Sequence, residues 1–367
     1  MGPYELCWCQ SGKKFKWCHF RRDEQDPIDN FAIEAELRDA LRKGYCSHPG
    51  READPCSRKI VKAHTIQKKG GLSAIADAGH VMTVKPIMKD MIESEGIPSP
   101  RRIGIGNASV FPGFCGKHDD ALFKPIERKE VPLDTDNAFL FAYRAIAYER
   151  FAKEAQRQGT QVQREMDRGQ SFSQQAAIQR YMHSMIAGIE IGMRDLERWT
   201  SLFDERLLSG SRAGFRFRAF RFDCVLPIVA CSAFHPEFDF HDNELQRLGR
   251  GDVDFDHVTL TVSSFVGHTV MVFGWIGDAA GPAAALADSF VRVDDDRKAD
   301  ALVRLLFVHS DNFFLRPSWW AALPKAEQDH LNLLMRSGTM ARVRNGAELV
   351  GDGRSFATAK VVETVGG

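Results

Sequence analysis

Apolar residues recur at the spacing of a helix through the middle of the chain. Between residues 173 and 208 they fall three or four positions apart, at Ile178, Met182, Met185, Ile189, Met193, Leu196 and Phe203. This period predicts a long amphipathic helix with a methionine-rich stripe that faces a core. A second helix is expected over residues 136–158, with Asp134 or Thr135 as its N-cap. The polar connection between the two favours an antiparallel helical hairpin or part of a dimer interface, and a shorter amphipathic helix is expected before Gly44.

The period changes to two from Gly214 onwards. Phe215 and Phe217 alternate with Arg216 and Arg218, which predicts a strand with one buried face. Apolar runs over residues 225–234 and 255–276 predict further strands, the second run as a hairpin. Helical patterns return over residues 283–293, 298–315 and 325–338, and a glycine-rich, loosely ordered tail is expected over residues 341–367.

The composition of the 367-residue chain is that of an ordinary globular protein. Hydrophobic residues make up 44% and charged residues 27%, which excludes a wholly disordered chain, a collagen and a coiled-coil rod. The 49 basic and 49 acidic side chains cancel, so any contact with nucleic acid needs a local basic surface. Residues 1–130 carry 22 basic and 18 acidic side chains, which makes this part the better candidate for binding a polyanion.

The cysteines are concentrated in the first third of the chain. No apolar stretch reaches the roughly 18 residues that cross a bilayer, and the polar first ten residues do not resemble a signal peptide. We therefore expect a soluble, cytoplasmic protein without membrane contact. In a reducing compartment, eight cysteines favour metal ligands or buried thiols over disulfides. Six lie within the first 115 residues, whereas Cys224 and Cys231 stand in an apolar segment and are expected to be buried.

The first cysteines belong to the stretch CWCQSGKKFKWCHF, which offers Cys7, Cys9, Cys18 and His19. Two close thiolates, a loop and a Cys-His pair can complete a tetrahedron around one zinc ion. The segment resembles the SEC-C motif almost position by position, although Gln10 stands where that family more often has glycine. The resemblance implies a zinc knuckle over residues 1–24, a bacterial source, and a surface for a protein partner.

A second set of zinc ligands is spread over a longer distance. Cys46 and Cys56 flank a loop rich in proline, glycine and charge, and Cys115 and His118 follow much later at Cys-x-x-His spacing. These four residues are expected to bind a second structural zinc ion, two ligands from each end. Between them, RKIVKAHTI predicts a short strand that ends at His64, and the segment after Cys115 has the spacing of a helix.

A strand that ends in histidine, a hairpin and a helix that begins with Cys-x-x-His resemble the zinc-stabilised HNH (His-Me finger) nucleases. The resemblance implies a ββα module over residues 43–133 that cleaves phosphodiester bonds in DNA or RNA. It implies that His64 is the general base and that Asp119 binds a catalytic Mg²⁺ or Mn²⁺. Asn107 is the candidate for the asparagine that the family carries between these two residues.

This segment departs from the family pattern at Ala63, which occupies the place of the first metal ligand. His80 or Asp120 is a candidate substitute. A structural interpretation also stays open, in which His64 is a buried histidine and Asp119 an acid in the first turn of a helix. The stretch between the two motifs is long and implies an insertion around residues 88–102. Basic residues nearby fit a phosphate-facing surface or a solvated loop, namely Lys59, Lys62, Lys68, Lys69, Arg101 and Arg102.

Two further segments carry candidate chemistry. The loop SAFHPEFDFHDNE offers a metal site or an ordinary solvated loop, through His235, Glu237, Asp239, His241 and Asp242. The stretch VHSDNFFLRPSWW offers an aromatic-walled pocket or a packed helix end.

The expected fold class is α+β. A zinc knuckle and a zinc-stabilised ββα module precede a domain over residues 134–340, with a helical hairpin, an antiparallel sheet and C-terminal helices. This domain is expected to sense a ligand or partner, or to mediate self-association as a homo-oligomer. The leading hypothesis is a metal-dependent endonuclease, similar in domain architecture to bacterial anti-phage defence effectors. The alternative is a non-catalytic zinc-scaffolded adaptor that binds protein or nucleic acid.

Overall fold

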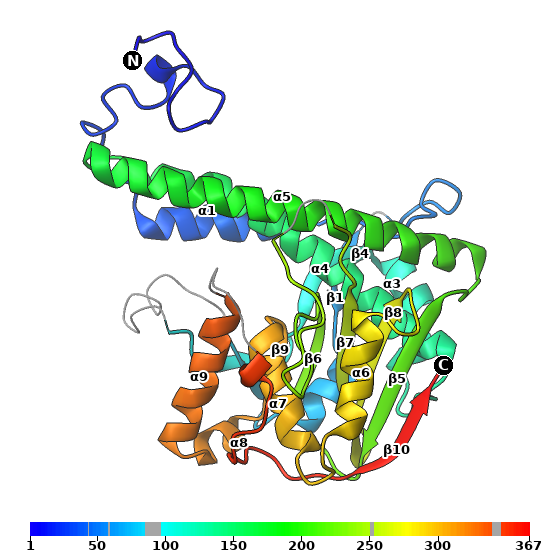
Figure 1. Ribbon diagram of the computed structural model, residues 1–367. Coiled ribbons are helices and arrows are strands. Elements are labelled where there is room, and N and C mark those ends of the chain that lie inside the picture. The colour runs from blue at the N-terminus through cyan, green and yellow to red at the C-terminus, as the bar shows by residue number, and fades with distance from the viewer. Residues whose placement is uncertain (43, 58, 85–96, 250–252, 340–345) are drawn as a thin grey trace. The chain divides into compact units, whose positions relative to one another are not determined.

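The computed structural model describes residues 1–367 except 43, 58, 85–96, 250–252 and 340–345 (Figure 1). The chain divides into two compact units, Met1–Lys43 with Arg150–Glu197, and Gly44–Glu149 with Arg198–Gly367. The long helices α4 (Thr135–Gln163) and α5 (Phe172–Ser209) contribute residues to both units. The division therefore falls inside these two helices.

The first unit contains the N-terminal cysteines and a helical hairpin. Its elements are the 3-10 turn η1 (Phe15–Trp17), α1 (Asn30–Arg42), the second half of α4, the turn η4 (Arg164–Asp167) and the first part of α5. Arg164 Nε donates to Gln179 Oε1 at 2.9 Å, and Arg157 lies 3.9 Å from Glu190. These pairs run in opposite order along the two helices, which confirms the predicted antiparallel hairpin. The methionine-rich stripe of α5 is largely buried, as at Met182, Ile189 and Met193.

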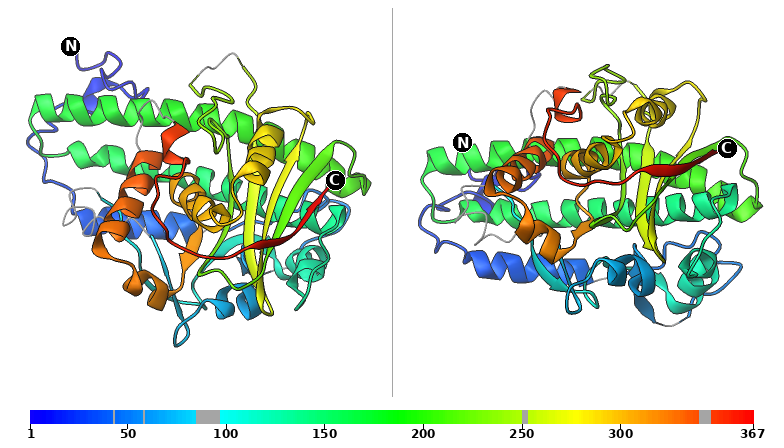
Figure 2. Two further views of the ribbon diagram at one scale, coloured as in Figure 1. Left: turned by 60° about the horizontal axis from the view of Figure 1, so that its bottom comes forward. Right: turned by 90° about the horizontal axis from the view of Figure 1, so that it is seen from below.

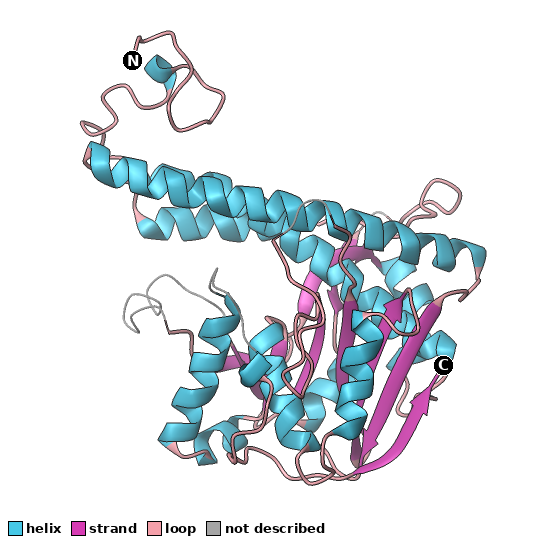
Figure 3. Ribbon diagram, viewed as in Figure 1, coloured by secondary structure: helices cyan, strands magenta, loops and turns pink. Residues whose placement is uncertain are grey.

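The second unit is built on an eight-stranded antiparallel sheet (Figure 3). Its strand order is β10-β5-β8-β7-β6-β9-β2-β3. In chain order these strands are β2 (His80–Thr83), β3 (Arg101–Gly104), β5 (Phe215–Phe222), β6 (Ile228–Phe234), β7 (Val258–Phe265), β8 (His268–Ile276), β9 (Phe313–Leu315) and β10 (Val361–Gly366). The strands predicted around residues 215, 225–234 and 255–276 are confirmed as β5, β6 and the β7–β8 hairpin.

Helices cover both faces of the large sheet. The helices α6 (Pro282–Arg292) and α7 (Lys298–His309) lie over one face (Figure 1), where the Phe290 ring centroid is 4.8 Å from that of Phe220. On the other face, the Phe139 ring of α4 lies 5.3 Å from that of Phe215. Every residue of β6 and β7 is consequently buried, which explains why a period of two was visible only in β5. The helix α9 (Lys325–Thr339) packs against α7, and α8 (Pro317–Ala322) and η5 (Gly346–Glu348) complete this side.

A smaller sheet in the same unit contains His64. Its strands β1 (Ile60–His64) and β4 (Val110–Cys115) are antiparallel, with Ile60 opposite Cys115 and His64 opposite Val110. The helix α3 (Gly116–Phe123) follows directly and packs on both strands, and the turn η3 (Lys124–Glu127) ends it. The predicted strand and helix are thus present. The turn η2 (Lys68–Leu72) follows β1.

The chain between β1 and β4 does not stay within a self-contained module. It supplies β2 and β3, which form one edge of the large sheet. The insertion predicted around residues 88–102 lies partly outside the described residues, since the structure describes nothing between residues 85 and 96.

Two predictions for the C-terminal part are wrong. The helix predicted over residues 298–315 ends at His309, and Phe313–Leu315 instead forms β9, because these apolar residues fill the gap between β6 and β2. Within the tail predicted to be loosely ordered, Val361–Gly366 forms β10, hydrogen-bonded to β5 at the edge of the sheet (Figure 2). Phe356 anchors this tail, since its ring is buried and its backbone N–H donates to Asp300 Oδ1 at 2.6 Å. Among the described residues, no helix is long and apolar enough to cross a membrane.

Candidate zinc centres and the site around His64

The four predicted ligands of the N-terminal knuckle lie together. The metal-binding atoms of Cys7, Cys9, Cys18 and His19 are all within 4.8 Å of one another. Cys7 Sγ lies 3.2 Å from His19 Nδ1, and the sulfurs of Cys9 and Cys18 are 3.4 Å apart. Three sulfurs and one imidazole nitrogen are a donor set that zinc prefers in closed, structural sites.

The backbone of the knuckle explains its sequence. The Cys7 N–H donates to the Lys13 carbonyl at 2.9 Å and closes the loop that carries Cys9. Gln10 has a φ of 59° and Gly12 a φ of 74°, both in the left-handed region. Glycine adopts this region without a steric cost, so the preference of the SEC-C family for glycine at the position of Gln10 follows from the turn.

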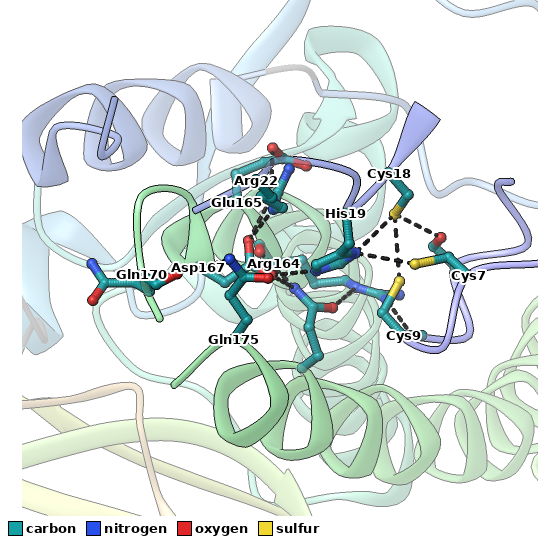
Figure 4. A network of polar contacts seen from close by, with 12 residues as sticks. Cys7, Cys9, Cys18, His19, Arg22, Arg164, Glu165, Asp167, Gln170 and Gln175 are labelled. Carbon is teal, nitrogen blue, oxygen red and sulfur yellow. Dashed lines mark hydrogen bonds and ion pairs between the residues drawn. The ribbon is translucent and has the colours of Figure 1, made fainter. Parts of the chain in front are cut away.

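A buried carboxylate orients the histidine of the knuckle (Figure 4). Asp167, at the end of η4, has no solvent exposure, and its Oδ2 accepts a hydrogen bond from His19 Nε2 at 2.7 Å. Gln179 Nε2 donates to the same oxygen at 2.6 Å, and Arg22 Nε donates to Oδ1 at 2.6 Å. Arg164 adds a bond from Nη2 to the Cys9 carbonyl at 2.6 Å. These contacts fix the ring of His19 with Nδ1 facing the sulfurs, as outer-shell carboxylates do in zinc sites.

The second set of predicted ligands also lies together. Cys46, Cys56, Cys115 and His118 place their ligand atoms within 4.8 Å of one another. His118 Nδ1 is 3.2 Å from Cys46 Sγ and 3.4 Å from Cys115 Sγ. Cys115 ends β4 and His118 stands in the first turn of α3, so one ion would hold the strand and the helix together. Two Cys3His clusters in one chain are compatible with two structural zinc ions.

One thiol in each cluster is predisposed to ionise. Burial raises the pKa of Cys9, but hydrogen bonds from His19 and Ser11 outweigh this effect and lower the pKa to about 5. Burial also raises the pKa of Cys115, while bonds from the His118 backbone and from Ser57 lower it to about 6. Burial raises the pKa of Cys7 to about 12 and that of Cys56 to about 11, so these two thiols would lose their protons only when metal binds. All eight cysteines are free thiols.

His64 lies at the end of β1, and its Nε2 atom is buried. Nε2 has no hydrogen-bond partner among the described residues. Burial lowers the pKa of His64 below its ordinary 6.5. Glu127 opposes this effect, and the positive charges of Lys68 and Arg144 add to it. The imidazole is therefore neutral near pH 7 and able to accept a proton.

Asp119, in the first turn of α3, is the second residue of this site. Its Oδ1 is buried and, in the part of the chain that the structure describes, has no hydrogen-bond partner. Burial raises its pKa to about 6, an effect that Arg144 opposes and Glu127 reinforces. The charges of the same two neighbours, Glu127 and Arg144, affect the pKa values of both His64 and Asp119.

The other predicted site residues lie elsewhere. Asn107 is exposed in the turn between β3 and β4, where its backbone N–H donates to the Gly104 carbonyl at 2.9 Å. Ser109, two residues after Asn107, contacts the chain that follows His64, since its Oγ accepts a hydrogen bond from the Ile66 N–H at 2.7 Å. His80 is exposed at the start of β2, with Nδ1 2.9 Å from the Ala78 carbonyl, and Asp120 is exposed on α3.

The two C-terminal candidate segments have structural roles. Asp239 Oδ1 accepts from the backbone N–H groups of His241 and Asn243 at 2.8 and 3.0 Å, so this carboxylate folds its own loop. Of the residues that the structure describes, those of the two Cys3His sets alone bring three or more His, Cys, Asp or Glu ligand atoms within 4.8 Å of one another. Trp320 is buried and stacks on Phe307, which favours the packed helix end over a pocket.

Glu127, Gln67 and Arg144 are the neighbours of His64 and Asp119 that the sequence analysis missed. Gln67 Nε2 donates to the Glu127 carbonyl, and Arg144 Nη2 donates to Glu127 Oε1 at 2.8 Å. One signal was available, because Arg144 is a lone charge within the apolar run FLFAYRAIAY. A buried arginine requires a partner, but the sequence does not identify that partner.

Comparison with known proteins identifies the N-terminal motif. The family model of the SEC-C motif matches residues 5–21, which includes the four ligands of the first cluster. The match spans a small part of the chain, and no nuclease family was matched. Comparisons with curated proteins and with solved structures found no match.

Proposed function

We propose that β1, β4 and α3 form the centre of a metal-dependent endonuclease, with His64 as the general base and Asp119 as a ligand of the divalent cation. The observation that carries this proposal is a pair of buried polar atoms without hydrogen-bond partners among the described residues, His64 Nε2 and Asp119 Oδ1. They stand at the end of β1 and at the start of α3, the positions of these two roles in the HNH nucleases that the sequence resembles.

The second zinc cluster supports this arrangement. Its ligands Cys115 and His118 directly precede Asp119, and Cys115 lies opposite Ile60 of the strand that carries His64. A closed four-ligand zinc site has no open position for substrate, so its role is to fix the two elements. The chemistry then belongs to the neighbouring residues.

The residues suit hydrolysis of a phosphodiester. The neutral His64 Nε2 accepts a proton from the attacking water, as a general base does. Asp119 Oδ1 is a hard oxygen donor of the kind that Mg²⁺ and Mn²⁺ prefer, and a cation held there would neutralise charge on the phosphate. Lys68 is exposed and interacts electrostatically with His64, so it is placed to attract the phosphate backbone.

The test is cleavage of plasmid DNA and of RNA by the full-length, zinc-loaded protein with Mg²⁺, Mn²⁺ or EDTA. The variant His64→Ala should lose about 100-fold or more of the rate, the usual contribution of a general base. His80→Ala, which removes an exposed histidine of β2, is the matched control and should retain the rate. Cleavage that survives EDTA, or that His64→Ala leaves unchanged, would overturn the assignment.

A second candidate function is that of a non-catalytic adaptor. The SEC-C match and the alanine at position 63, whose side chain is buried, favour it. An adaptor would show no cleavage of either nucleic acid under any metal condition. It would instead retain a protein or nucleic-acid partner in a pull-down, and that retention would depend on the zinc in the first cluster.

A further inference from the structure

Four buried polar atoms without hydrogen-bond partners among the described residues belong to side chains that contact Glu127 or interact with it electrostatically. They are His64 Nε2, Gln67 Oε1, Asp119 Oδ1 and Arg144 Nε. An unsatisfied buried polar atom costs about 1–3 kcal/mol, so native proteins retain few of them. Gln67 Oε1 and Asp119 Oδ1 are oxygen acceptors that a cation can bind, whereas Arg144 Nε is a donor that pairs with water or another acceptor.

The contacts of Glu127 connect these side chains. Its carbonyl accepts from Gln67 Nε2, and its Oε1 accepts from Arg144 Nη2 at 2.8 Å. His64 and Asp119 both interact with it electrostatically. The guanidinium of Arg144 is almost completely buried and lies 4.1 Å from the centroid of the Phe123 ring, so it holds Glu127 Oε1 from a fixed position.

This arrangement leaves one oxygen of Glu127 and one of Gln67 available to bind a ligand. Glu127 Oε2 has no hydrogen bond among the residues that the structure describes, and its side chain is 41% exposed, which gives water and substrate access. Gln67 commits its amide nitrogen to the Glu127 carbonyl, so its Oε1 is fixed as an acceptor. Gly70 lies against this amide, because a Cβ there would come within 2.7 Å of Gln67 Oε1.

We propose that Glu127 and Gln67 complete the cation site beside His64, Glu127 with its carboxylate and Gln67 with its amide oxygen, and that Arg144 positions Glu127. With Asp119 they form a set of three oxygen ligands from β1's following turn, α3 and η3. The inference rests on the proposed function for the use of the cation in cleavage. It supplies the ligand that Ala63 cannot provide.

The chemistry of the set favours Mg²⁺ or Mn²⁺ over zinc. Hard cations take oxygen ligands, and Mg²⁺ is commonly held by one or two carboxylates while it keeps several waters. In the described part of the chain, Asp119, Glu127 and His64 do not bring three ligand atoms within 4.8 Å of one another, so these side chains would have to move closer together around an ion. The two carboxylates and the amide would therefore contact an ion whose remaining positions hold water or substrate phosphate.

The test is Mn²⁺ binding to the full-length protein loaded with two zinc ions, followed by electron paramagnetic resonance and calorimetry. Glu127→Gln and Asp119→Asn should each weaken Mn²⁺ binding about tenfold or more, as changes in or next to a metal ligand do. Gln67→Leu, which touches no ion pair, should weaken it as well and serves if Glu127→Gln fails to fold. Glu130→Gln removes an exposed carboxylate that belongs to no proposed site and should leave the affinity unchanged.

The outcomes separate this inference from the proposed function. Unchanged Mn²⁺ affinity in folded Glu127→Gln and Gln67→Leu, with two zinc ions retained, would overturn the inference even if the protein cleaves nucleic acid. Loss of Mn²⁺ binding in these variants, with no cleavage by the unmodified protein, would support the site and refute the nuclease.

Discussion

The change Asp167→Asn tests how the N-terminal zinc knuckle is held. Asp167 has no solvent exposure, and its two oxygens accept bonds from His19, Gln179 and Arg22 at 2.6–2.7 Å. Asparagine keeps the shape and one acceptor oxygen but removes the charge. It also places an NH2 group against one of these donors. The ring of His19 then loses the partner that fixes its orientation, and the guanidinium of Arg22 loses its buried counter-ion.

The structure sets the size of the effect. Loss of an outer-shell carboxylate usually weakens metal binding about 10- to 100-fold, which corresponds to about 1.4–2.7 kcal/mol. The side chain of Arg22 is only 9% exposed, so breaking its pair adds a loss of fold stability. For a buried pair this loss is about 3–5 kcal/mol when one partner is removed, and Asp167→Ala should approach it.

The assay is competition for zinc with a chromophoric chelator, with total zinc measured by elemental analysis. The unmodified protein should hold two zinc ions, and Asp167→Asn should release one of them at lower chelator concentration. Asp54→Asn is the matched control, because Asp54 is the corresponding partner of His118, at 3.3 Å, but is 53% exposed. Its effect should be smaller, since solvent screens exposed charges. Equal zinc affinity in Asp167→Asn and the unmodified protein would refute the role of this carboxylate.

Two further predictions concern His64, the proposed general base, and the hydrophobic core. Burial and the charges of Lys68 and Arg144 lower the pKa of His64, against the opposing charge of Glu127, so the neutral base persists below pH 6.5. The decrease of kcat/KM on the acid side of its pH profile should therefore have its midpoint below pH 6.5. A midpoint at or above pH 6.5 would contradict the assignment. Phe290→Ala should cost about 3–5 kcal/mol of unfolding free energy in urea, because this fully buried ring contacts Phe220, Phe240 and Phe273. Val291→Ala, at a side chain 43% exposed, should cost far less, and similar losses in both variants would show that the packing argument is wrong.

The two Cys3His clusters were predictable because their residues follow spacings that are typical of zinc ligands. Cys7, Cys9, Cys18 and His19 lie within 13 residues, and the Cys-x-x-His pair at Cys115 begins a helix whose period is visible in the sequence. The long hairpin of α4 and α5 was predictable for the same reason, since its stripe repeats over many turns.

What could not be predicted depends on pairing between distant segments. Nothing near Phe313 indicates that it leaves a helical pattern to pair with β6, because an apolar run fits a buried helix and a buried strand equally well. The neighbours of His64 are of this kind too. Glu127 is one acid within the charged run ERKE, and its bond to Arg144 spans 17 residues across a chain reversal.

The placement of β2 and β3 has a consequence for modularity. The chain leaves the small sheet after His64, contributes two strands to the large sheet, and returns at Val110. Asn312, next to β9, donates from Nδ2 to Thr65 Oγ1 at 2.9 Å and ties the two sheets together beside the histidine. An excised piece of residues 43–133 would keep the pairing of β2 with β3 but would expose the edge of β2 that pairs with β9, and it would lose the Asn312 contact beside His64. An engineered fragment that carries the His64 site should therefore include the large sheet.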